Sequence, residues 1–315
     1  MSKTKTHIIL NPASGAGKTE SRSAEILRLI EHRLGDSLSL HVTQTRLEAT
    51  GSAAEAIQRG CELIVAIGGD GTIQEVVNGF FVDGHLINPG CELGIINCGT
   101  GHGFAQSLGL PQSIESQVEL LAYGRTRFVD VGRVRYASGD GSASDRYFVN
   151  ECQFGIGGAV VERVQGNHKQ LGGTFAFGLG ALETLFSHKN QWMKVILDEK
   201  KMITERMTGV VIANGAYMGG GMNLAPTARL DDGTLKVLIM RDLSIVQRLW
   251  NFPRIYSGTH LRSPLFGYHE ARSLAISSGE SVLVEADGEI LGTTPCEIEV
   301  IPSAIQVRSI SLNGG

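Results

Sequence analysis

The sequence lacks an excess of positive charge. Its 315 residues carry 28 Lys and Arg against 32 Asp and Glu, a net charge of −4, and its longest basic run is the pair Lys200-Lys201. A protein that binds nucleic acid needs a basic surface to neutralise the phosphates. We therefore expect no nucleic acid among its partners.

Cysteine is scarce, and its spacing is not that of a zinc site or of a disulfide framework. The number is odd, no CxxC pair occurs, and the flanking residues are apolar, which favours reduced, buried thiols and a cytoplasmic location. The five positions are Cys61, Cys91, Cys98, Cys152 and Cys296.

Long uninterrupted apolar runs are also missing. The start, "MSKTKTHIIL", has too few apolar residues for a signal peptide. Residues 170–182 are too few to cross a bilayer, and residues 207–226 contain two asparagines and five glycines. We expect a globular cytoplasmic protein without a membrane span.

Glycine, in contrast, is abundant. There are 41 glycines, about 13% of the chain against a usual share of about 7%. They cluster in turns, without a collagen period. Such turns need left-handed backbone or close main-chain approach, which favours binding sites built from main chain.

Strands alternate with helices over the first 125 residues or so. Short apolar runs at 7–11, 38–45, 62–69 and 92–99 predict strands, and the segments that follow have helical periodicity. This alternation predicts an open, parallel α/β sheet, which binds ligands at the carboxyl ends of its strands.

From about Phe128 the pattern changes to short alternating runs bounded by Gly and Asp-Gly. These predict an antiparallel, sandwich-like second domain. We expect an α/β nucleotide-binding domain at 1–128, a β-sandwich domain at 129–300, and a segment at 301–315 that could return to the first domain. Helical insertions are predicted at 158–166, 171–187 and 244–257.

The first glycine loop, "NPASGAGKT", resembles a P-loop only in part. Gly17-Lys18-Thr19 matches the end of that motif, but Pro12 stands where its first glycine belongs and offers no N–H group. The loop could still face a phosphate at the start of the following helix, or be a plain turn capped by Ser14 or Thr19.

The second loop, "GGDGT" at 68–72, is more specific. Three glycines within four residues leave N–H groups open for polyphosphate oxygens. Asp70 should repel a phosphate, so it either holds a magnesium ion bound to that phosphate or orders the loop by accepting N–H bonds. A third turn of this kind has glycines at Gly99, Gly101 and Gly103.

These motifs resemble the diacylglycerol kinase catalytic family, bacterial lipid kinases with an NAD-kinase-like fold. The resemblance extends over nearly the whole chain. The GGDGT motif is shared with NAD kinases, whereas the last two of the following blocks are far more specific to the lipid kinases. The matching segments are "NPASG", "GGDGT", "GTGHGFA", "GGGMNLAPTARLDDGTLKV" and "EADGEILGTTPCEIEVIP".

The resemblance implies ATP-dependent phosphorylation of a lipid hydroxyl, with ATP and Mg²⁺ as cofactors. Main chain and side chains near the GGDGT loop would hold the nucleotide. Thr45 competes with Thr43 for one of these contacts. The implied nucleotide residues are Asn11, Thr43, Gly68, Gly69, Asp70, Gly71, Thr72, Glu75 and Thr100.

The resemblance also implies a proton acceptor and a structural magnesium site. The acceptor would be Glu289, with Asp287 beside it and Asp70 on the phosphate side. From the residues alone, ordinary hairpin turns are the favoured interpretation of Asp287-Gly288 and Asp232-Gly233. The implied metal ligands are the Asp232 side chain and the main-chain carbonyls of Arg229 and Thr234.

One departure from the family pattern concerns the acceptor. The chain has His102-Gly103 where members commonly have Asn-Asp, which leaves the lipid unidentified. Two alternatives remain: an NAD kinase, which could use Asn150-Glu151, or a catalytically silent nucleotide or lipid sensor.

A lipid substrate needs an apolar receptor. Residues 171–186 could line an acyl-chain pocket, touch a bilayer surface, or form a core helix. We expect a lipid substrate and peripheral contact with a membrane, and a homodimer is also considered.

Overall fold

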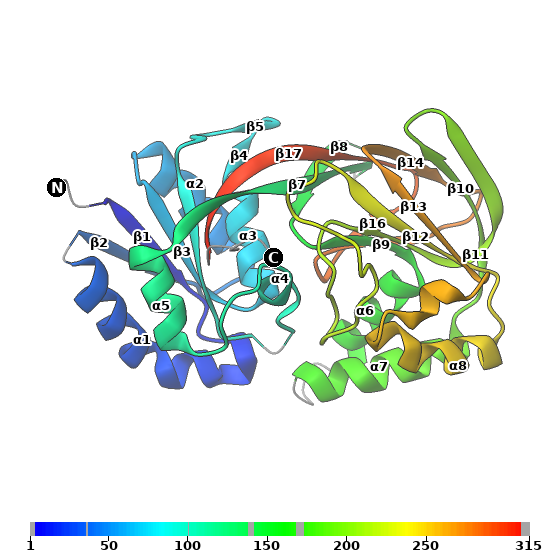
Figure 1. Ribbon diagram of the computed structural model, residues 1–315, viewed down its shortest axis with the longest axis horizontal. Helices are drawn as coiled ribbons and strands as arrows, with labels where there is room; N and C mark the ends of the chain where they lie inside the picture. The colour runs from blue at the N-terminus through cyan, green and yellow to red at the C-terminus, as the bar shows by residue number, and fades with distance from the viewer. Residues whose placement is uncertain (1–3, 36, 100, 138–141, 168–172, 310–315) are drawn as a thin grey trace. The chain divides into compact units, whose positions relative to one another are not determined.

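The protein divides into two compact units in a computed structural model, which describes residues 4–35, 37–99, 101–137, 142–167 and 173–309 (Figure 1). Unit 1 joins Met1–Val129 to Ser303–Gly315, and unit 2 is Asp130–Pro302. Two strands, β7 (Arg125–Ala137) and β17 (Cys296–Ser309), each have residues in both units.

Unit 1 contains the parallel sheet that the alternating pattern predicts. Its strands follow the order β6-β3-β1-β2, all parallel, and the end of β17 adds to β6 through the pair Gln306 and Glu92. The open parallel sheet is therefore confirmed. Its strands are β1 (Thr6–Leu10), β2 (Leu38–Val42), β3 (Leu63–Gly68) and β6 (Glu92–Asn97).

Helices cover both faces of this sheet. Ile26 and Ile30 of α1 and Val118 of α5 pack on alternate strand residues such as Ile8 and Val65, while α2 and α3 contact the sheet's other face (Figure 1). These elements and the smaller ones of unit 1 are η1 (Ser14–Gly17), α1 (Lys18–Leu34), α2 (Glu48–Gln58), α3 (Asp70–Asn78), β4 (Phe81–Val82), β5 (His85–Leu86), α4 (Gly103–Ser107) and α5 (Ile114–Tyr123).

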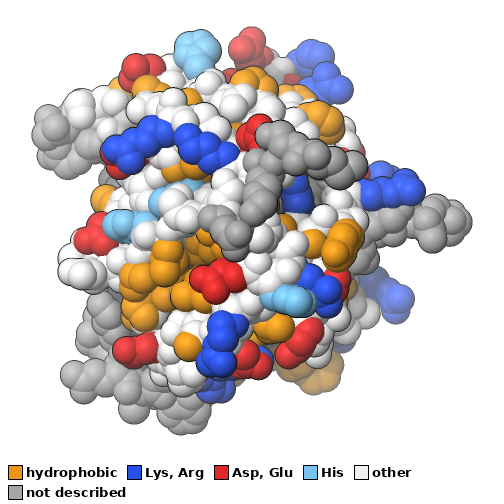
Figure 2. All heavy atoms as spheres, turned by 90° about the vertical axis from the view of Figure 1, so that its left-hand side faces the viewer, with side chains coloured by type: hydrophobic (Ala, Val, Ile, Leu, Met, Phe, Trp, Pro, Cys, Tyr) orange, Lys and Arg blue, Asp and Glu red, His pale blue; other side chains and the backbone are white. Residues whose placement is uncertain are grey.

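Strand β2 forms the outer edge of the sheet, and among the described residues no further strand pairs with it. Leu40 and Val42 of β2 and Leu47 after it are exposed, and Figure 2 shows hydrophobic side chains gathered on this side of the molecule. The homodimer stays a prediction.

Unit 2 contains the predicted antiparallel sandwich, which is thereby confirmed. Its strands follow the order β16-β15-β9-β11-β10-β14-β17, with β12 on β11, β13 on β12, and β8 on β7. Their alternate apolar residues fill one core, which includes Phe148, Phe154, Val195, Ile212 and Ile298. The remaining strands are β8 (Ala143–Phe148), β9 (Glu151–Gly155), β10 (Gln191–Leu197), β11 (Lys201–Ala213), β12 (Leu235–Arg241), β13 (Phe266–Ala271), β14 (Ser273–Ser277), β15 (Leu283–Ala286) and β16 (Glu289–Thr293).

The three predicted helical insertions are present in unit 2. They are α6 (Ile156–Asn167), α7 (Gly173–Ser187) and α8 (Ile245–Tyr256), and the short helix η3 (Thr259–Arg262) follows α8. None of the helices in the described residues is long and apolar enough to cross a membrane. All five cysteines are free thiols, and four of them are buried.

Candidate functional site

Three loops of unit 1 pack against one another at the carboxyl ends of β1, β3 and β6. A Cβ atom on Gly15, in the first loop, would lie 2.4 Å from the carbonyl oxygen of Cys98 in the third. A Cβ atom on Gly99 would lie 2.5 Å from the Cα of Gly69 in the second. Side chains at these positions would push the loops apart, so the glycines hold main chain against main chain.

The glycines of the GGDGT loop are there for space and not for left-handed backbone. Gly68, Gly69 and Gly71 are absent from the residues with positive φ. A Cβ on Gly68 would lie 2.4 Å from the Thr72 hydroxyl, whereas a Cβ on Gly71 would meet nothing within 4 Å. Gly71 is exposed in the first turn of α3. No contact in the described residues requires glycine there, so the turn leaves room for another group to approach the main chain closely.

Asp70 orders the loops through its carboxylate. Its oxygens accept the amide N–H groups of Gly103 at 3.2 Å and Phe104 at 3.3 Å. Burial raises the pKa of Asp70, and these two bonds, followed by the nearby His102, oppose the rise. These contacts fit the loop-ordering role that the sequence left open. The magnesium role of Asp70 stays a prediction.

Asn11 connects the first loop to the second. Its side-chain amide donates to the Thr72 hydroxyl at 3.0 Å, and its side-chain oxygen accepts the Ala13 N–H at 3.1 Å. Ser14 and Thr19 bond to each other at 2.6 Å. Helix α1 is preceded by Gly17 and has no side-chain cap, so the predicted capping role of Ser14 or Thr19 is wrong. That this loop faces a phosphate stays a prediction.

The other predicted nucleotide residues lie around these loops. Thr43 is buried and its hydroxyl donates to the Leu10 carbonyl at 3.4 Å, while Thr45 is exposed and bonds to Glu48. Glu75 accepts the N–H of Leu47 at 3.1 Å, which ties the loop after β2 to α3. Thr100 lies outside the described residues.

His102, the departure from the family pattern, has a hydrogen-bond partner. Its Nδ1 lies 2.7 Å from the side-chain nitrogen of Asn97, whose oxygen accepts the N–H of Gly99 at 3.1 Å. The histidine is exposed and has a polar partner within the third loop.

In unit 2, Asp287 and Gly288 form the turn of a hairpin between β15 and β16. Both have positive φ, 45° and 86°, and Ala286 pairs with Glu289 across the turn, the geometry of a type I′ turn. The Asp287 carboxylate accepts three amide N–H groups, from Val149 at 2.8 Å, Asn150 at 3.1 Å and Glu151 at 2.9 Å. It therefore fastens the turn to the segment before β9.

Glu289 stands at the start of β16 with different contacts. Its carboxylate forms an ion pair with Arg146 of β8, and the two side chains are each 13% exposed. The Asp287 carboxylate is thus engaged by main-chain N–H groups, whereas Glu289 pairs with a charged side chain. Arg146 was missed by sequence reasoning, because nothing local marks it as the partner of a residue 143 positions away.

Glu285 lies on β15, two residues before Asp287, and is completely buried. One carboxyl oxygen accepts the N–H of Gly288 at 2.9 Å, and the other has no hydrogen-bond partner in the described structure. Burial raises the pKa of Glu285 to about 8. The alternation of acids in "EADGE" was the signal for it, but the sequence could not show which of them is buried.

The predicted metal site around Asp232 contains a cation of the chain itself. The Lys236 ammonium lies 3.1 Å from an Asp232 carboxylate oxygen, 3.1 Å from the Thr234 hydroxyl and 3.0 Å from Glu270. Burial lowers the pKa of Lys236, but its bonds to Glu270 and Asp232 raise it above the ordinary value.

This arrangement does not fit a bound divalent ion unless Lys236 moves away. Nor do the described residues contain any cluster of three or more His, Cys, Asp or Glu suited to a metal. The Asp232-Gly233 turn is also no hairpin, since it precedes β12 and no strand directly before it pairs back.

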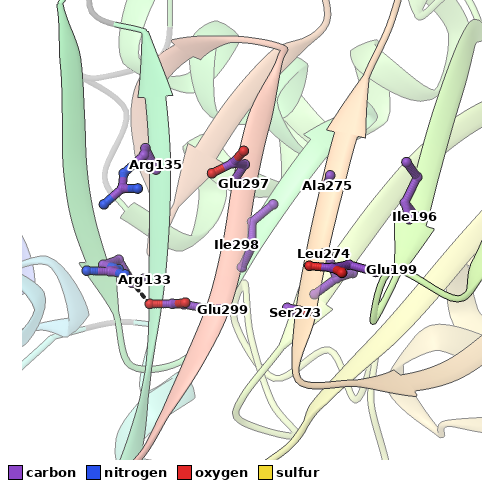
Figure 3. A pocket seen from close by; sticks show the side chains of 10 residues that line it. All are labelled: Arg133, Arg135, Ile196, Glu199, Ser273, Leu274, Ala275, Glu297, Ile298 and Glu299. Atoms are coloured by element: carbon purple, nitrogen blue, oxygen red, sulfur yellow. Dashed lines mark ion pairs between the residues drawn. The ribbon is translucent and has the colours of Figure 1, made fainter.

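A surface pocket of unit 2 lies on strands β7, β10, β14 and β17 (Figure 3). Arg133 there forms an ion pair with Glu299. The pocket contains none of the predicted site residues. The residues that line it are Arg133, Arg135, Ile196, Glu199, Ser273, Leu274, Ala275, Glu297, Ile298 and Glu299.

Comparison with known protein families divides the chain much as the structure does. Residues 5–134 match the diacylglycerol kinase catalytic domain. Residues 151–309, just over half of the chain, match the YegS C-terminal NAD kinase beta sandwich-like domain.

Curated proteins named diacylglycerol kinase are similar over nearly the full length. The one from Staphylococcus carnosus is 29% identical over 97% of this chain and 95% of its own. The one from Bacillus subtilis is 29% identical over 93% of this chain and 92% of its own.

Solved structures confirm the NAD-kinase-like fold. A crystal structure from Bacillus anthracis, described with the words diacylglycerol kinase, has a TM-score of 0.77 at 24% identity and covers 99% of both chains. Yeast NADH kinase complexed with NADH has a TM-score of 0.56 at 13% identity, over 99% of this chain and 85% of its own. At these identities the likeness establishes the fold alone.

Proposed function

This chain belongs to the kinase family that joins a diacylglycerol kinase catalytic domain to a YegS-type β-sandwich domain, and we propose that it transfers the γ-phosphoryl group of ATP to a lipid hydroxyl. The observation that carries the nucleotide half of the proposal is Gly71. It is exposed, its φ is negative, and no protein atom lies near its Cβ position.

The chain's part at the nucleotide would be to bind and orient it. N–H groups at the start of α3, together with the helix dipole, would favour phosphate oxygens next to Gly69 and Gly71. Asp70 would keep the loop in place from behind through Gly103 and Phe104. A magnesium ion that arrives with ATP would supply the charge that offsets the phosphates.

At the acceptor, Glu289 would take the proton of the lipid hydroxyl. Its carboxylate forms an ion pair with the Arg146 side chain, whereas the Asp287 carboxylate accepts three amide N–H groups of the main chain. A general base must be able to reach the proton that it takes, and this favours Glu289 over Asp287. The hydroxyl oxygen then forms the new bond to phosphorus as the bond to ADP breaks. Action on a lipid implies a protein at the membrane surface.

Transfer from radiolabelled ATP to a panel of diacylglycerol, ceramide, sphingoid bases and NAD tests this function. We expect label in at least one lipid and none in NADP. Transfer to NAD alone would contradict the lipid acceptor. ATP binding without transfer to any lipid would instead indicate a sensor, and the Glu289→Gln variant would then be indistinguishable from the wild type.

A further inference from the structure

Helix α8 presents an apolar stripe to solvent. Val246 is 75% exposed and Trp250 69% exposed, and they stand four residues apart on one face of the helix. The Arg254 guanidinium, a further four residues along, lies 5.3 Å from the centre of the Trp250 ring. Neighbouring exposed apolar side chains on one helix face form a contiguous apolar surface, which marks an interaction site more often than a single exposed side chain does.

The opposite face of α8 fixes the helix in unit 2. Leu249, Phe252 and Ile255 pack on a buried cluster of the unit. Arg248 is buried, and its guanidinium donates to the carbonyl oxygens of Leu185 at 3.0 Å and His188 at 2.8 Å. The packing of α8 on unit 2 therefore does not depend on the exposed stripe, which lies on a helix anchored by its other face.

Helix α7 lies next to α8 and also exposes apolar side chains (Figure 1). Leu182 is 45% exposed and Phe186 53% exposed, while Ala181 and Leu185 are buried. The described part of residues 171–186 therefore has both a buried face, as in a core helix, and an exposed apolar face that could touch a bilayer. We call Leu182, Phe186, Val246 and Trp250 the helical patch.

The charge around the patch favours an anionic partner. Residues 244–269 contain no Asp or Glu, in a chain whose net charge is −4. Of their three arginines, Arg248 is buried on the opposite face, whereas Arg254 is partly exposed and Arg262 is exposed. The nearest acids in sequence are Asp242 before this segment and Glu270 after it, and they pair with Arg206 and Lys236. Glu183 on α7 pairs with Arg163.

We propose that the helical patch is the surface by which this protein docks on a bilayer that contains anionic phospholipid. Apolar side chains and a tryptophan suit the boundary between head groups and acyl chains. Each arginine near an anionic membrane surface strengthens binding by about 1 kcal/mol. The inference rests on the proposed function, because a lipid acceptor resides in a bilayer, but docking itself needs no phosphoryl transfer.

The chain offers a matched probe, because its two tryptophans are both exposed, Trp250 on α8 and Trp192, 58% exposed, on β10. Trp192→Phe leaves Trp250 as the only tryptophan, and Trp250→Phe leaves Trp192. Both variants are titrated with vesicles of phosphatidylcholine, with and without phosphatidylglycerol. We expect the emission of Trp250 to shift to shorter wavelength with the anionic vesicles and that of Trp192 to stay constant.

Co-sedimentation with the same vesicles measures how strongly the protein partitions onto them. Val246→Ser with Trp250→Ser should weaken partitioning by roughly tenfold or more, since each removes apolar area that would leave water. The control is Trp192→Ser with Met202→Ser, which removes side chains of similar exposure, 58% and 63%, and should keep wild-type partitioning.

Several results would overturn the docking surface: an unchanged Trp250 emission, equal losses in the two double variants, or partitioning that does not depend on phosphatidylglycerol. A shift that follows protein concentration without vesicles, with a larger species in size-exclusion chromatography, would assign the patch to a second copy instead. Glu289→Gln should bind vesicles like the wild type. If the wild type binds vesicles but labels no lipid, docking stands and the proposed function fails.

Discussion

The two candidate sites are built from different kinds of contact. In unit 1 the loops touch main chain to main chain, with Gly69 against Gly99 and the Asp70 carboxylate on two amide groups. In unit 2 the predicted site residues instead form ion pairs between side chains, Glu289 with Arg146 and Asp232 with Lys236.

This difference suits the two substrates in the proposed reaction. A polyphosphate is bound by many weak main-chain donors that need precise spacing. Substitutions in unit 1 should therefore impair binding by adding bulk. Proton transfer depends on one group, so substitutions in unit 2 should impair the reaction by removing a charge. Substitutions can test whether the division holds.

The largest effect is expected from Glu289→Gln, which keeps the shape of the side chain and removes its ability to take a proton. Phosphoryl transfer should fall by about 100-fold or more, and ATP affinity, measured by calorimetry, should be nearly unchanged. A variant with full activity would transfer the role of base to Asp287 or Asp70.

Glu299→Gln is the matched control for this change. Glu299 also pairs with an arginine of unit 2, Arg133, but lies outside the predicted site. Its variant should keep the wild-type rate. Equal losses in both variants would mean that Glu289 acts only by holding a strand in place.

In unit 1 the contrast is between two glycines. Gly99→Ala puts a methyl group 2.5 Å from the Gly69 Cα and should lower the free energy of unfolding by about 1–3 kcal/mol. Gly71→Ala meets no protein atom and should keep or slightly raise that free energy, because alanine favours helix, yet weaken ATP binding. Chemical denaturation and calorimetry measure the two quantities.

Normal ATP affinity in Gly71→Ala would contradict a phosphate at this turn. Equal destabilisation by the two substitutions would contradict the steric account of the loops.

A smaller effect, on pH dependence, is expected from Glu285→Gln. The folded-state pKa of Glu285, about 8, lies above its ordinary 4.5, so between these pH values the folded protein binds more protons than the unfolded chain. The free energy of unfolding should therefore fall as the pH rises through this window, and the variant should show a flatter profile. Parallel profiles in denaturant melts would mean that Glu285 does not hold a proton.

The smallest effect should occur at Lys236, which has the partly exposed Glu270 as one partner. Lys236→Met leaves two carboxylates facing each other and should cost about 1–2 kcal/mol. Millimolar magnesium should recover part of this loss in thermal melts, while the wild type and Lys201→Met should not respond. Stabilisation of the wild type by magnesium that Asp232→Asn abolishes would support the predicted metal site.

The sequence predicts the elements of both units because their apolar periods are local. The runs at 7–11 and 62–69 and the helix at 244–257 all lie within a few residues of β1, β3 and α8. The glycine turns are equally local, and they mark the end of the sheet where the loops meet.

Partners from distant strands could not be predicted in this way. Arg146 reaches Glu289 and Lys236 reaches Glu270 only after the antiparallel strands have paired, and one residue of register decides which face a side chain takes. The empty space beside Gly71 likewise becomes visible only in the three-dimensional structure.

Strand β17 gives unit 1 an unusual dependence during synthesis. Its last residues pair with β6, and Arg308 bonds to Glu92 and to the Leu121 carbonyl. All of unit 2 lies between β6 and these residues in the chain. A ribosome must therefore release the whole sandwich before the first sheet to be made can gain its final strand, and a nascent chain carries an open β6 edge until then.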